Sequence, residues 1–371
     1  MKVIISGGGT GGHIFPAIAI AEAIKKNDTS AEILFVGAEG KMEMESVPRA
    51  GYRIIGLPVV GFQRRFNLKN LRNNLFFPFK LISSLLRARK IISDFRPDVV
   101  VGVGGYASGP ILRVAMSMGV PGLIQEQNSY AGVTNRLLGK KAAKICVAYD
   151  NMERFFPADK IVNLGNPVRS DILKKNIATE EARTFYGLDP AKKTIVLIGG
   201  SLGAKSLNEA VLHSEELLKK RPDVQLLWQC GKLYVDQLQQ SSVAQLENVK
   251  LTAFLNKMDL AYAAADVVIS RAGALSISEI CLVAKPAILV PSPNVSEDHQ
   301  TSNAMSLVGK GAALLVKDSK ANREMMPAAF SLLSDEQKMN ELSKHIAGLA
   351  KPNASENIAQ LVLEIGRGPK S

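Results

Sequence analysis

Short apolar runs that end in glycine-rich turns recur along the chain, and apolar residues at helical spacing follow each turn. Val3, Ile4 and Ile5 lead into GGGTGGH (7–13), and from Ile14 apolar residues recur every three or four positions. The same order returns in VVVGVGGYASGP (99–110), KKTIVLIGGSLGAKSLN (192–208) and ADVVISRAGALSISE (265–279). Further strands that end in polar residues are PGLIQEQN (121–128) and KPAILVPSPN (285–294). Strands that alternate with helices in this way predict an α/β fold with parallel sheets.

The second half of the chain repeats the plan of the first, which predicts two doubly wound, Rossmann-like domains. A glycine and an Asn-Pro pair in GNPVRSD (165–171) interrupt regular structure between the halves. We expect one domain over residues 1–165 and a second over 166–346, with a C-terminal helix of about residues 347–371 packed back on the first. Ligands of such sheets bind beyond the carboxyl ends of the strands, so two facing edges would form one cleft.

The first glycine turn has three interpretations. Bare backbone at a helix start can bind a phosphate, whereas a tight turn needs glycine without any ligand. The spacing of Gly7, Gly9 and Gly12 also fits a dinucleotide fingerprint, but Glu39 is a poor candidate for the acidic residue that this fingerprint requires after the next strand.

The later turns also carry more than one interpretation. GGSLGAKS (199–206) has Ala204 where a P-loop needs glycine, which disfavours a P-loop kinase or ATPase. The helix that follows SRAG can offer N–H groups to a diphosphate. Ser276 and Glu279 have the spacing of a capping box, an alternative that involves no ligand. No D-x-D pair exists in the sequence to hold a metal on a nucleotide diphosphate, so helix N-termini and backbone donors would have to meet its charge.

The chain has 371 residues, of which 46% are hydrophobic, and this length and composition indicate a globular protein of two domains. The sequence contains no apolar run long enough to span a bilayer. The N-terminal apolar run is too short for a secretory signal, and we expect it to be a strand. Cys146, Cys230 and Cys281 lie far apart in apolar surroundings and are expected to be buried thiols rather than zinc ligands.

The formal net charge of +12 favours an acidic partner, and its distribution narrows the choice. The segment that begins at Phe62 and ends at Ile92 holds eight Lys and Arg residues, no acid and five of the 13 phenylalanines. Aromatic residues among cations suit the headgroup region of an anionic membrane. We therefore expect this segment to bind an anionic membrane surface, and we expect no nucleic-acid partner.

Several motifs together resemble those of bacterial GT-B glycosyltransferases that use UDP-N-acetylglucosamine to form lipid II for peptidoglycan. These motifs are GGGTGGHIFPA, GVGGYASGP, EQNSYAGVTNR, GNPVRSD, GGSLGAKSLN, SRAGALSISE and DHQTSNA, and the resemblance covers nearly the whole chain. It implies that the second domain binds the sugar nucleotide and that the first, against the membrane, receives the lipid-linked acceptor. We expect neither a cofactor nor a metal.

The resemblance also implies roles for individual residues. Arg169 and Leu255 would border the uracil, and Glu279 would hold the ribose hydroxyls. Gln300 and Asn128 would contact the sugar. The expected substrate-binding residues are Thr10, Gly11, Gly12, Asn128, Arg169, Ser201, Leu255, Ala274, Leu275, Ser276, Ile277, Ser278, Glu279 and Gln300. Two positions depart from the common pattern, with His299 in place of a second glutamine and Leu255 in place of isoleucine.

His13 follows the first glycine turn, where it would face the cleft and an acceptor hydroxyl. Histidine changes protonation near neutral pH, which suits a general base. We therefore predict that His13 is catalytic, and the alternative is a histidine that only orients the loop.

The predicted reaction is inverting transfer of N-acetylglucosamine from UDP-N-acetylglucosamine to the muramoyl 4-hydroxyl of undecaprenyl-linked lipid I, giving lipid II. It would take place at the cytoplasmic face of the bacterial inner membrane, to which the protein binds peripherally. Three alternatives are a related transferase for another lipid acceptor, a dinucleotide-dependent oxidoreductase and a non-catalytic nucleotide-sugar-binding subunit.

Overall fold

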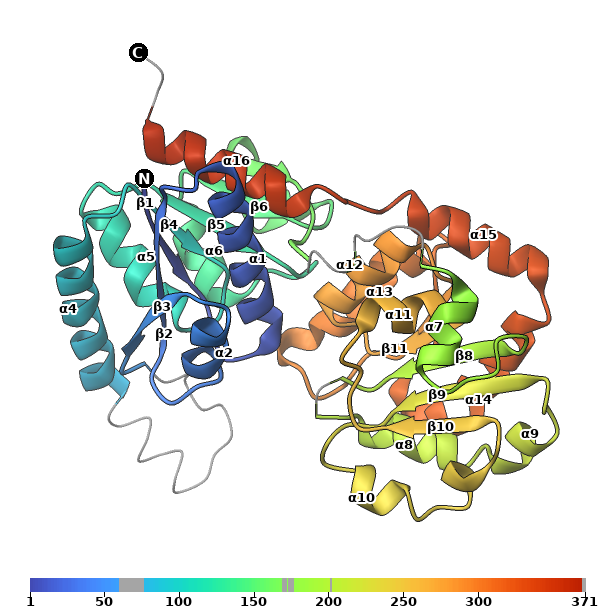
Figure 1. Cartoon of the computed structure of the whole chain (residues 1–371). Coiled ribbons are helices and arrows are strands. Elements are labelled where there is room, and N and C mark those ends of the chain that lie inside the picture. Colours follow the sequence, from blue (N-terminus) through green and yellow to red (C-terminus); the bar gives the residue numbers. More distant parts are fainter. Residues whose placement is uncertain (60–76, 169–171, 173–176, 201, 369–371) are drawn as a thin grey trace. The chain divides into compact units, whose positions relative to one another are not determined.

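The chain divides into two compact units, each built on a parallel sheet with helices on its faces (Figure 1). The computed structural model describes residues 1–59, 77–168, 172, 177–200 and 202–368. The first unit comprises Met1–Arg169 together with Asn353–Ser371, and the second comprises Ser170–Pro352.

The first unit contains a seven-stranded sheet in the order β3-β2-β1-β4-β5-β6-β7, and all neighbouring strands are parallel. Its strands are β1 (Lys2–Ser6), β2 (Glu32–Ala38), β3 (Arg53–Leu57), β4 (Val99–Gly102), β5 (Gly122–Glu126), β6 (Lys144–Val147) and β7 (Ile161–Asn163). Its α-helices are α1 (Gly11–Asn27), α2 (Glu43–Arg49), α4 (Phe77–Phe95), α5 (Ser108–Ser117), α6 (Val133–Gly139) and α16 (Ala354–Arg367). Two short 3-10 helices are η1 (Met152–Arg154) and η2 (Ala158–Lys160).

The first sheet is buried on both faces. Val3 and Ile5 point into one core, with α1 and α16, whereas Ile4 points into the other, with α4 and α5. Successive side chains of a strand point to opposite faces, so one apolar run supplies both cores. The C-terminal helix α16 lies beside α1 and buries Ile358 and Val362 there, so the two ends of the chain share this unit (Figure 1).

The second unit contains a six-stranded parallel sheet in the order β10-β9-β8-β11-β12-β13. Its strands are β8 (Lys193–Ile198), β9 (Val224–Gln229), β10 (Val249–Thr252), β11 (Val267–Ser270), β12 (Ala287–Leu289) and β13 (Leu314–Leu315). Its α-helices are α7 (Thr179–Phe185), α8 (Lys205–Leu212), α9 (Glu215–Lys219), α10 (Val235–Leu238), α11 (Met258–Ala264), α12 (Ala274–Val283), α13 (His299–Val308), α14 (Ala321–Leu333) and α15 (Glu336–Ala347). Short 3-10 helices are η4 (Val243–Gln245), η5 (Ser296–Asp298) and η6 (Asp318–Lys320).

The two sheets have the same strand order around a point of reversal, which lies between β1 and β4 in the first unit and between β8 and β11 in the second. The prediction of two doubly wound α/β domains is therefore confirmed. The prediction that their edges face one another across a cleft stays a prediction. Among the described residues, no helix is long and apolar enough to cross a membrane.

Two helix starts differ from the sequence-based expectation. Helix α1 begins at Gly11 rather than at Ile14, after Thr10 in extended conformation, because apolar periodicity marks where a helix packs and not where its backbone begins to turn. Proline generally disfavours a helix, yet Pro78 is the second residue of α4. A proline is tolerated there because first-turn N–H groups have no partner within the helix.

All three cysteines are buried and free, as predicted. Burial raises the pKa of Cys146 and of Cys281 to about 12, so both remain protonated thiols at neutral pH. They contribute to the cores as small apolar side chains.

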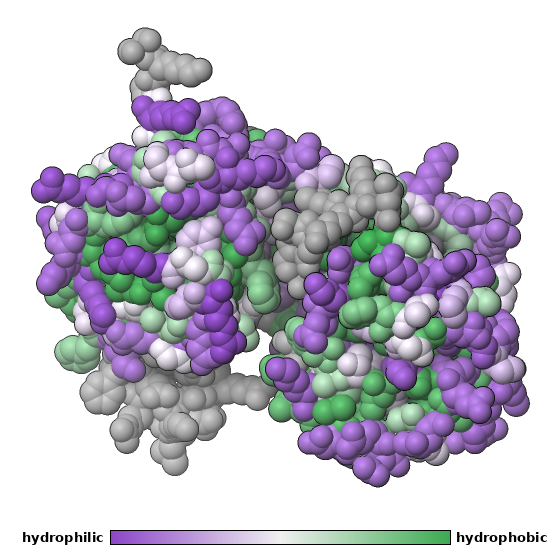
Figure 2. All heavy atoms as spheres, in the orientation of Figure 1, coloured by the Kyte–Doolittle hydropathy of each residue, from purple (hydrophilic) through white to green (hydrophobic). Residues whose placement is uncertain are grey.

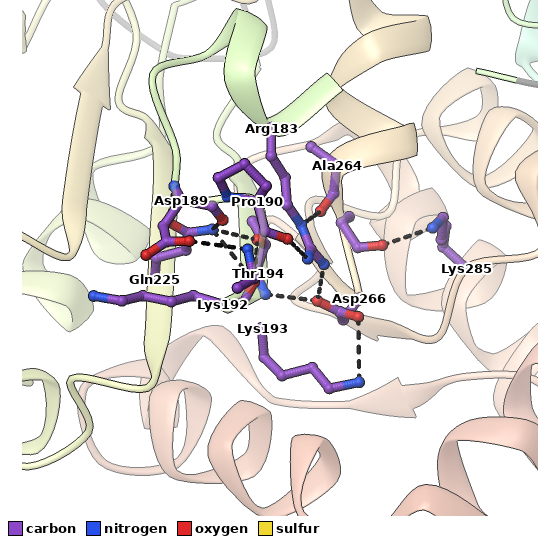
Figure 3. A network of polar contacts seen from close by, with 12 residues as sticks. Arg183, Asp189, Pro190, Lys192, Lys193, Thr194, Gln225, Ala264, Asp266 and Lys285 are labelled. Atoms are coloured by element: carbon purple, nitrogen blue, oxygen red, sulfur yellow. Dashed lines mark hydrogen bonds and ion pairs between the residues drawn. The ribbon is translucent and has the colours of Figure 1, made fainter. Parts of the chain in front are cut away.

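A buried ion pair fixes α7 to the amino-terminal edge of the second sheet (Figure 3). Asp266 precedes β11 and accepts hydrogen bonds from Arg183 Nη2 at 2.7 Å and from the Thr194 backbone N–H at 2.6 Å. The same guanidinium donates to the carbonyl oxygens of Pro190 and Ala264. Lys285 donates to Ala265, and burial lowers its pKa. This edge is opposite to the one where the glycine turns lie, and the network joins α7 to the starts of β8 and β11 there.

Replacing Asp266 by Asn should lower the free energy of unfolding of the second unit by about 3 kcal/mol, because Arg183 would keep a buried charge without its counterion. Trp228 is the single tryptophan and is fully buried in β9, so its fluorescence during urea denaturation reports this unit. As a control, Lys193→Ala should cost under about 1 kcal/mol, since this exposed ammonium lies 3.7 Å from the same carboxylate. Equal losses in both variants would contradict the assignment.

Candidate functional site

In the first unit, two glycine turns approach one another at the carboxyl ends of β1 and β4. An added Cβ at Gly105 would lie 2.5 Å from the carbonyl oxygen of Gly8, and one at Gly104 would lie 3.0 Å from Cδ2 of the His13 ring. Gly104 and Gly105 also have φ values of 92° and 77°, which side chains rarely adopt. Only glycine therefore allows this close approach, and the second turn packs directly against the first turn and against His13.

The His13 ring is held by the backbone of its own loop. Its Nδ1 lies 3.2 Å from the Gly8 carbonyl oxygen and 3.3 Å from Thr10 Oγ1. Thr10 is the N-cap of α1, and Gly11 and Gly12 are its first two residues, so His13 lies in the first helical turn and is half-buried. The structure thus brings together the predicted residues from Thr10 to His13 at the sheet edge.

Asn128 lies two residues beyond β5, which neighbours β4 in the sheet. Its backbone N–H donates to Glu126 Oε1 at 3.0 Å, and the other oxygen of this buried carboxylate accepts from Gly132 N–H and from Asn135 Nδ2. Glu126 therefore fixes the turn that presents Asn128. No role was predicted for Glu126 from the sequence. A carboxylate at the end of an apolar strand could nevertheless have indicated that it fixes the following turn.

In the second unit, the start of α12 lies at the corresponding point of reversal. The helix begins at Ala274, after the N-cap residue Gly273 with extended backbone, and three residues separate it from the carboxyl end of β11. Its first turn presents the backbone N–H groups of Ala274, Leu275 and Ser276, which can donate to an anion. Ile277 and Ser278 continue this helix, and Ser278 Oγ donates to the Ala274 carbonyl.

The capping-box alternative for Ser276 and Glu279 is wrong, because the N-cap is Gly273 and both residues lie inside α12. Glu279 is buried, and its Oε2 accepts a hydrogen bond from the hydroxyl of the buried Tyr262 at 3.0 Å. Leu255 is also buried and lies between β10 and α11.

Gln300 lies in the first turn of α13, and its Oε1 accepts from the Ser292 backbone N–H at 2.8 Å. This contact ties the helix to the turn after β12 and leaves the orientation of the carboxamide fixed. His299 is the first residue of α13 and is half-buried. The predicted site residues Arg169 and Ser201 lie outside the described residues.

Two side chains in the second unit fix the turns at this edge, and neither was assigned a role from the sequence. Gln229, at the end of β9, accepts from Gly200 N–H at 3.0 Å and donates to the Gly200 carbonyl at 2.8 Å. Arg271, just beyond β11, pairs with Asp318 and donates to Ser206 Oγ and to the Val290 carbonyl. The sequence shows that Gln229 and Arg271 are polar residues at the ends of apolar strands. It does not show which groups they bind, because their partners are far away in sequence.

Each sheet therefore presents, at its carboxyl edge, backbone donors together with at least one buried carboxylate. The edge of the first sheet adds the imidazole of His13, a group that can accept a proton, and the edge of the second adds a helix start whose N–H groups can donate to an anion. Glu39 forms an ion pair with Arg87 of α4, so its carboxylate is engaged away from the glycine turn. Within the described ranges, no cluster of three or more His, Cys, Asp or Glu side chains could hold a metal ion.

Comparisons with known proteins agree with this two-part arrangement. Residues 3–147 match the model of the glycosyltransferase family 28 N-terminal domain, and residues 194–361 match that of the family 28 C-terminal domain.

Relatives of similar length carry one name, UDP-N-acetylglucosamine–N-acetylmuramyl-(pentapeptide) pyrophosphoryl-undecaprenol N-acetylglucosamine transferase. The protein of this name from Bacteroides fragilis is 55% identical over 369 residues, covering 99% of this chain and 96% of its own. That from Flavobacterium psychrophilum is 50% identical over 370 residues, with 100% and 99% covered. The crystal structure of Acinetobacter baumannii MurG superposes with a TM-score of 0.76 at 29% identity, covering 98% of this chain and 99% of the other. With both family models matched across its two units, the chain belongs to glycosyltransferase family 28.

Proposed function

We propose that this protein transfers N-acetylglucosamine from UDP-N-acetylglucosamine to the muramoyl sugar of lipid I, an undecaprenyl-diphospho-muramoyl-pentapeptide, and so forms lipid II. The observation that carries the proposal is the identity of 50–55% to transferases named for this reaction, over nearly their full length. Turnover of UDP-N-acetylglucosamine with a short-chain lipid I analogue tests it. Transfer to a different lipid acceptor, with none to lipid I, would contradict it.

The second unit, predicted from the sequence as residues 166–346 and observed as Ser170–Pro352, would bind the donor. The first-turn N–H groups of α12 and Ser201 would meet the diphosphate, because a helix start favours negative charge. Leu255 and Arg169 would border the uracil, and Glu279 would accept hydrogen bonds from both ribose hydroxyls. Gln300 would contact the sugar with its carboxamide.

The first unit, predicted from the sequence as residues 1–165 with the C-terminal helix and observed as Met1–Arg169 with Asn353–Ser371, would bind the acceptor. Thr10, Gly11 and Gly12 would lie against the acceptor, since their backbone is accessible and their side chains are small or absent. Asn128 would contact the transferred sugar. The 4-hydroxyl oxygen would attack the anomeric carbon while His13 takes its proton. The bond to the diphosphate oxygen would break on the opposite face, its electron pair would leave with UDP, and the configuration would invert.

Replacing Glu279 by Ala should raise the KM for UDP-N-acetylglucosamine and lower kcat/KM about 10- to 150-fold, because charge-assisted hydrogen bonds to the ribose contribute about 1.5–3 kcal/mol. Steady-state kinetics with varied donor measure this effect. The matched control is Tyr262→Phe, which removes the internal hydrogen bond to Glu279 but keeps the carboxylate. A loss of thermal stability alone in Glu279→Ala would assign the carboxylate a purely structural role.

Replacing His13 by Ala should lower kcat by about 100-fold or more and leave the KM for the donor little changed, because a general base acts in the transition state. In His13→Gln, the rise of kcat with pH that a histidine causes between about pH 5 and 8 should disappear. His213→Gln alters an exposed histidine and serves as the control. An unchanged pH–rate profile in His13→Gln would remove its role as the base.

Attachment to the membrane would use α4, the described part of the basic segment; residues 62–76 of that segment lie outside the described residues. Phe79, Ile82 and Leu86 are 71%, 56% and 66% exposed, and their spacing places them along one side of the helix. Exposed cations lie beside them, so apolar and charged side chains mix at this surface (Figure 2). This combination suits the headgroup region of an anionic leaflet, and we propose peripheral binding at the cytoplasmic face of the bacterial inner membrane.

Changing Phe79, Ile82 and Leu86 together to Ser should weaken sedimentation with anionic liposomes, because less apolar area would enter the headgroup region. Changing Lys80, Arg89 and Lys90 to Gln should weaken it too, by about 1 kcal/mol per charge, and added salt should reduce binding of the parent. Lys25→Gln with Lys26→Gln on α1 removes charge elsewhere as the control. If both folded α4 variants sediment like the parent, α4 is not the attachment surface.

A further inference from the structure

Glu43, the first residue of α2, buries its carboxylate beside the first glycine turn. The residue is 1% exposed. Oε2 accepts from the Gly9 backbone N–H at 3.1 Å, and Oε1 accepts from the Ala38 backbone N–H at 2.9 Å. A charged group is retained in such a place only when hydrogen bonds replace the lost water. Here the two oxygens join the turn after β1 to the end of β2.

The first glycine turn packs directly against the Glu43 carboxylate. A Cβ atom at Gly8 would lie 2.0 Å from Glu43 Oε1, so only glycine lets the backbone come so close. The ring of Tyr106 lies over Gly9, and burial together with the Glu43 charge raises the pKa of this tyrosine. Glu43 thus determines the position of the turn from the side of α2.

Gly8 in turn holds His13, through the 3.2 Å contact between its carbonyl oxygen and Nδ1. A carbonyl oxygen only accepts hydrogen bonds, so this contact is a hydrogen bond only when Nδ1 carries the proton, and Thr10 Oγ1, 3.3 Å from the same nitrogen, can also accept from it. In a neutral imidazole the lone pair is then on Nε2, the nitrogen that can take a proton. A displacement of Gly8 would remove the contact that selects this tautomer.

We infer that Glu43 is a positioning residue, which fixes the Gly8–Gly9 backbone and thereby holds His13 in the tautomer with a basic Nε2. The inference rests on the proposed role of His13 as the base. A carboxylate is required because two N–H donors, on different elements, each need an acceptor oxygen. An amide of the same shape would place its NH₂ group against one of those donors.

The test compares Glu43→Gln with Glu45→Gln, an exposed position on the same helix. Glu43→Gln should lower kcat about 10- to 100-fold with the KM for UDP-N-acetylglucosamine within twofold, because misplaced catalytic groups affect the transition state. Long-range ¹⁵N–¹H spectra of histidine-labelled protein report the tautomer without turnover. The chain has four histidines, and His13→Gln identifies the signal of interest. The parent and Glu45→Gln should show the Nδ1–H form, and Glu43→Gln a mixture or the Nε2–H form.

An unchanged tautomer in folded Glu43→Gln overturns the inference, whether or not kcat falls, as does an Nε2–H form in the parent. If Glu43→Gln does not fold, the same tautomer comparison is made with Glu43→Asp. This variant keeps the charge but has a shorter side chain, and an unchanged tautomer in it likewise overturns the inference. If His13→Gln keeps full activity, the proposed base is wrong, whereas the tautomer comparison still decides whether Glu43 orients the ring.

Discussion

The architecture depends on one geometric constraint, the parallel alignment of strands within each sheet. Parallel strands bring all their carboxyl ends to one edge of the sheet, and the turns that carry candidate site residues follow the two strands on either side of the point where the strand order reverses. In the first unit this point lies between β1 and β4, and in the second between β8 and β11. The glycine turns and the start of α12 follow these four strands, so positions far apart in sequence become neighbours.

Glycine turns allow close approach but do not hold themselves in place, since glycine loses more conformational freedom on folding than other residues. Buried polar side chains from neighbouring elements provide the missing constraint here. Glu43 accepts from Gly9, Glu126 accepts from the turn after β5, and Gln229 both accepts from and donates to Gly200. Each such contact fixes backbone that the proposed chemistry requires in one conformation.

In the second sheet, the Arg183–Asp266 ion pair and the residues proposed to bind substrate lie at opposite edges. The Arg183–Asp266 pair lies at the amino-terminal edge, where it joins α7, β8 and the start of β11. Arg271 and Gln229 lie at the carboxyl edge and fix the turns there. Each edge thus has its own ion pair, Arg183–Asp266 at the amino-terminal edge and Arg271–Asp318 at the carboxyl edge.

The sequence alone indicated the alternation of strands and helices, the two-domain plan and the positions of the glycine turns, because apolar periodicity and glycine act over a few residues. It also placed His13, Asn128 and the start of α12 at strand ends. It could not determine that α1 begins at Gly11, that Ser276 is not an N-cap, or that Glu43 supports the first turn. Glu43 lies 34 residues beyond Gly9, and Tyr262 lies 17 before Glu279. Only tertiary packing decides such contacts, since a buried carboxylate is stable only where the fold supplies its donors.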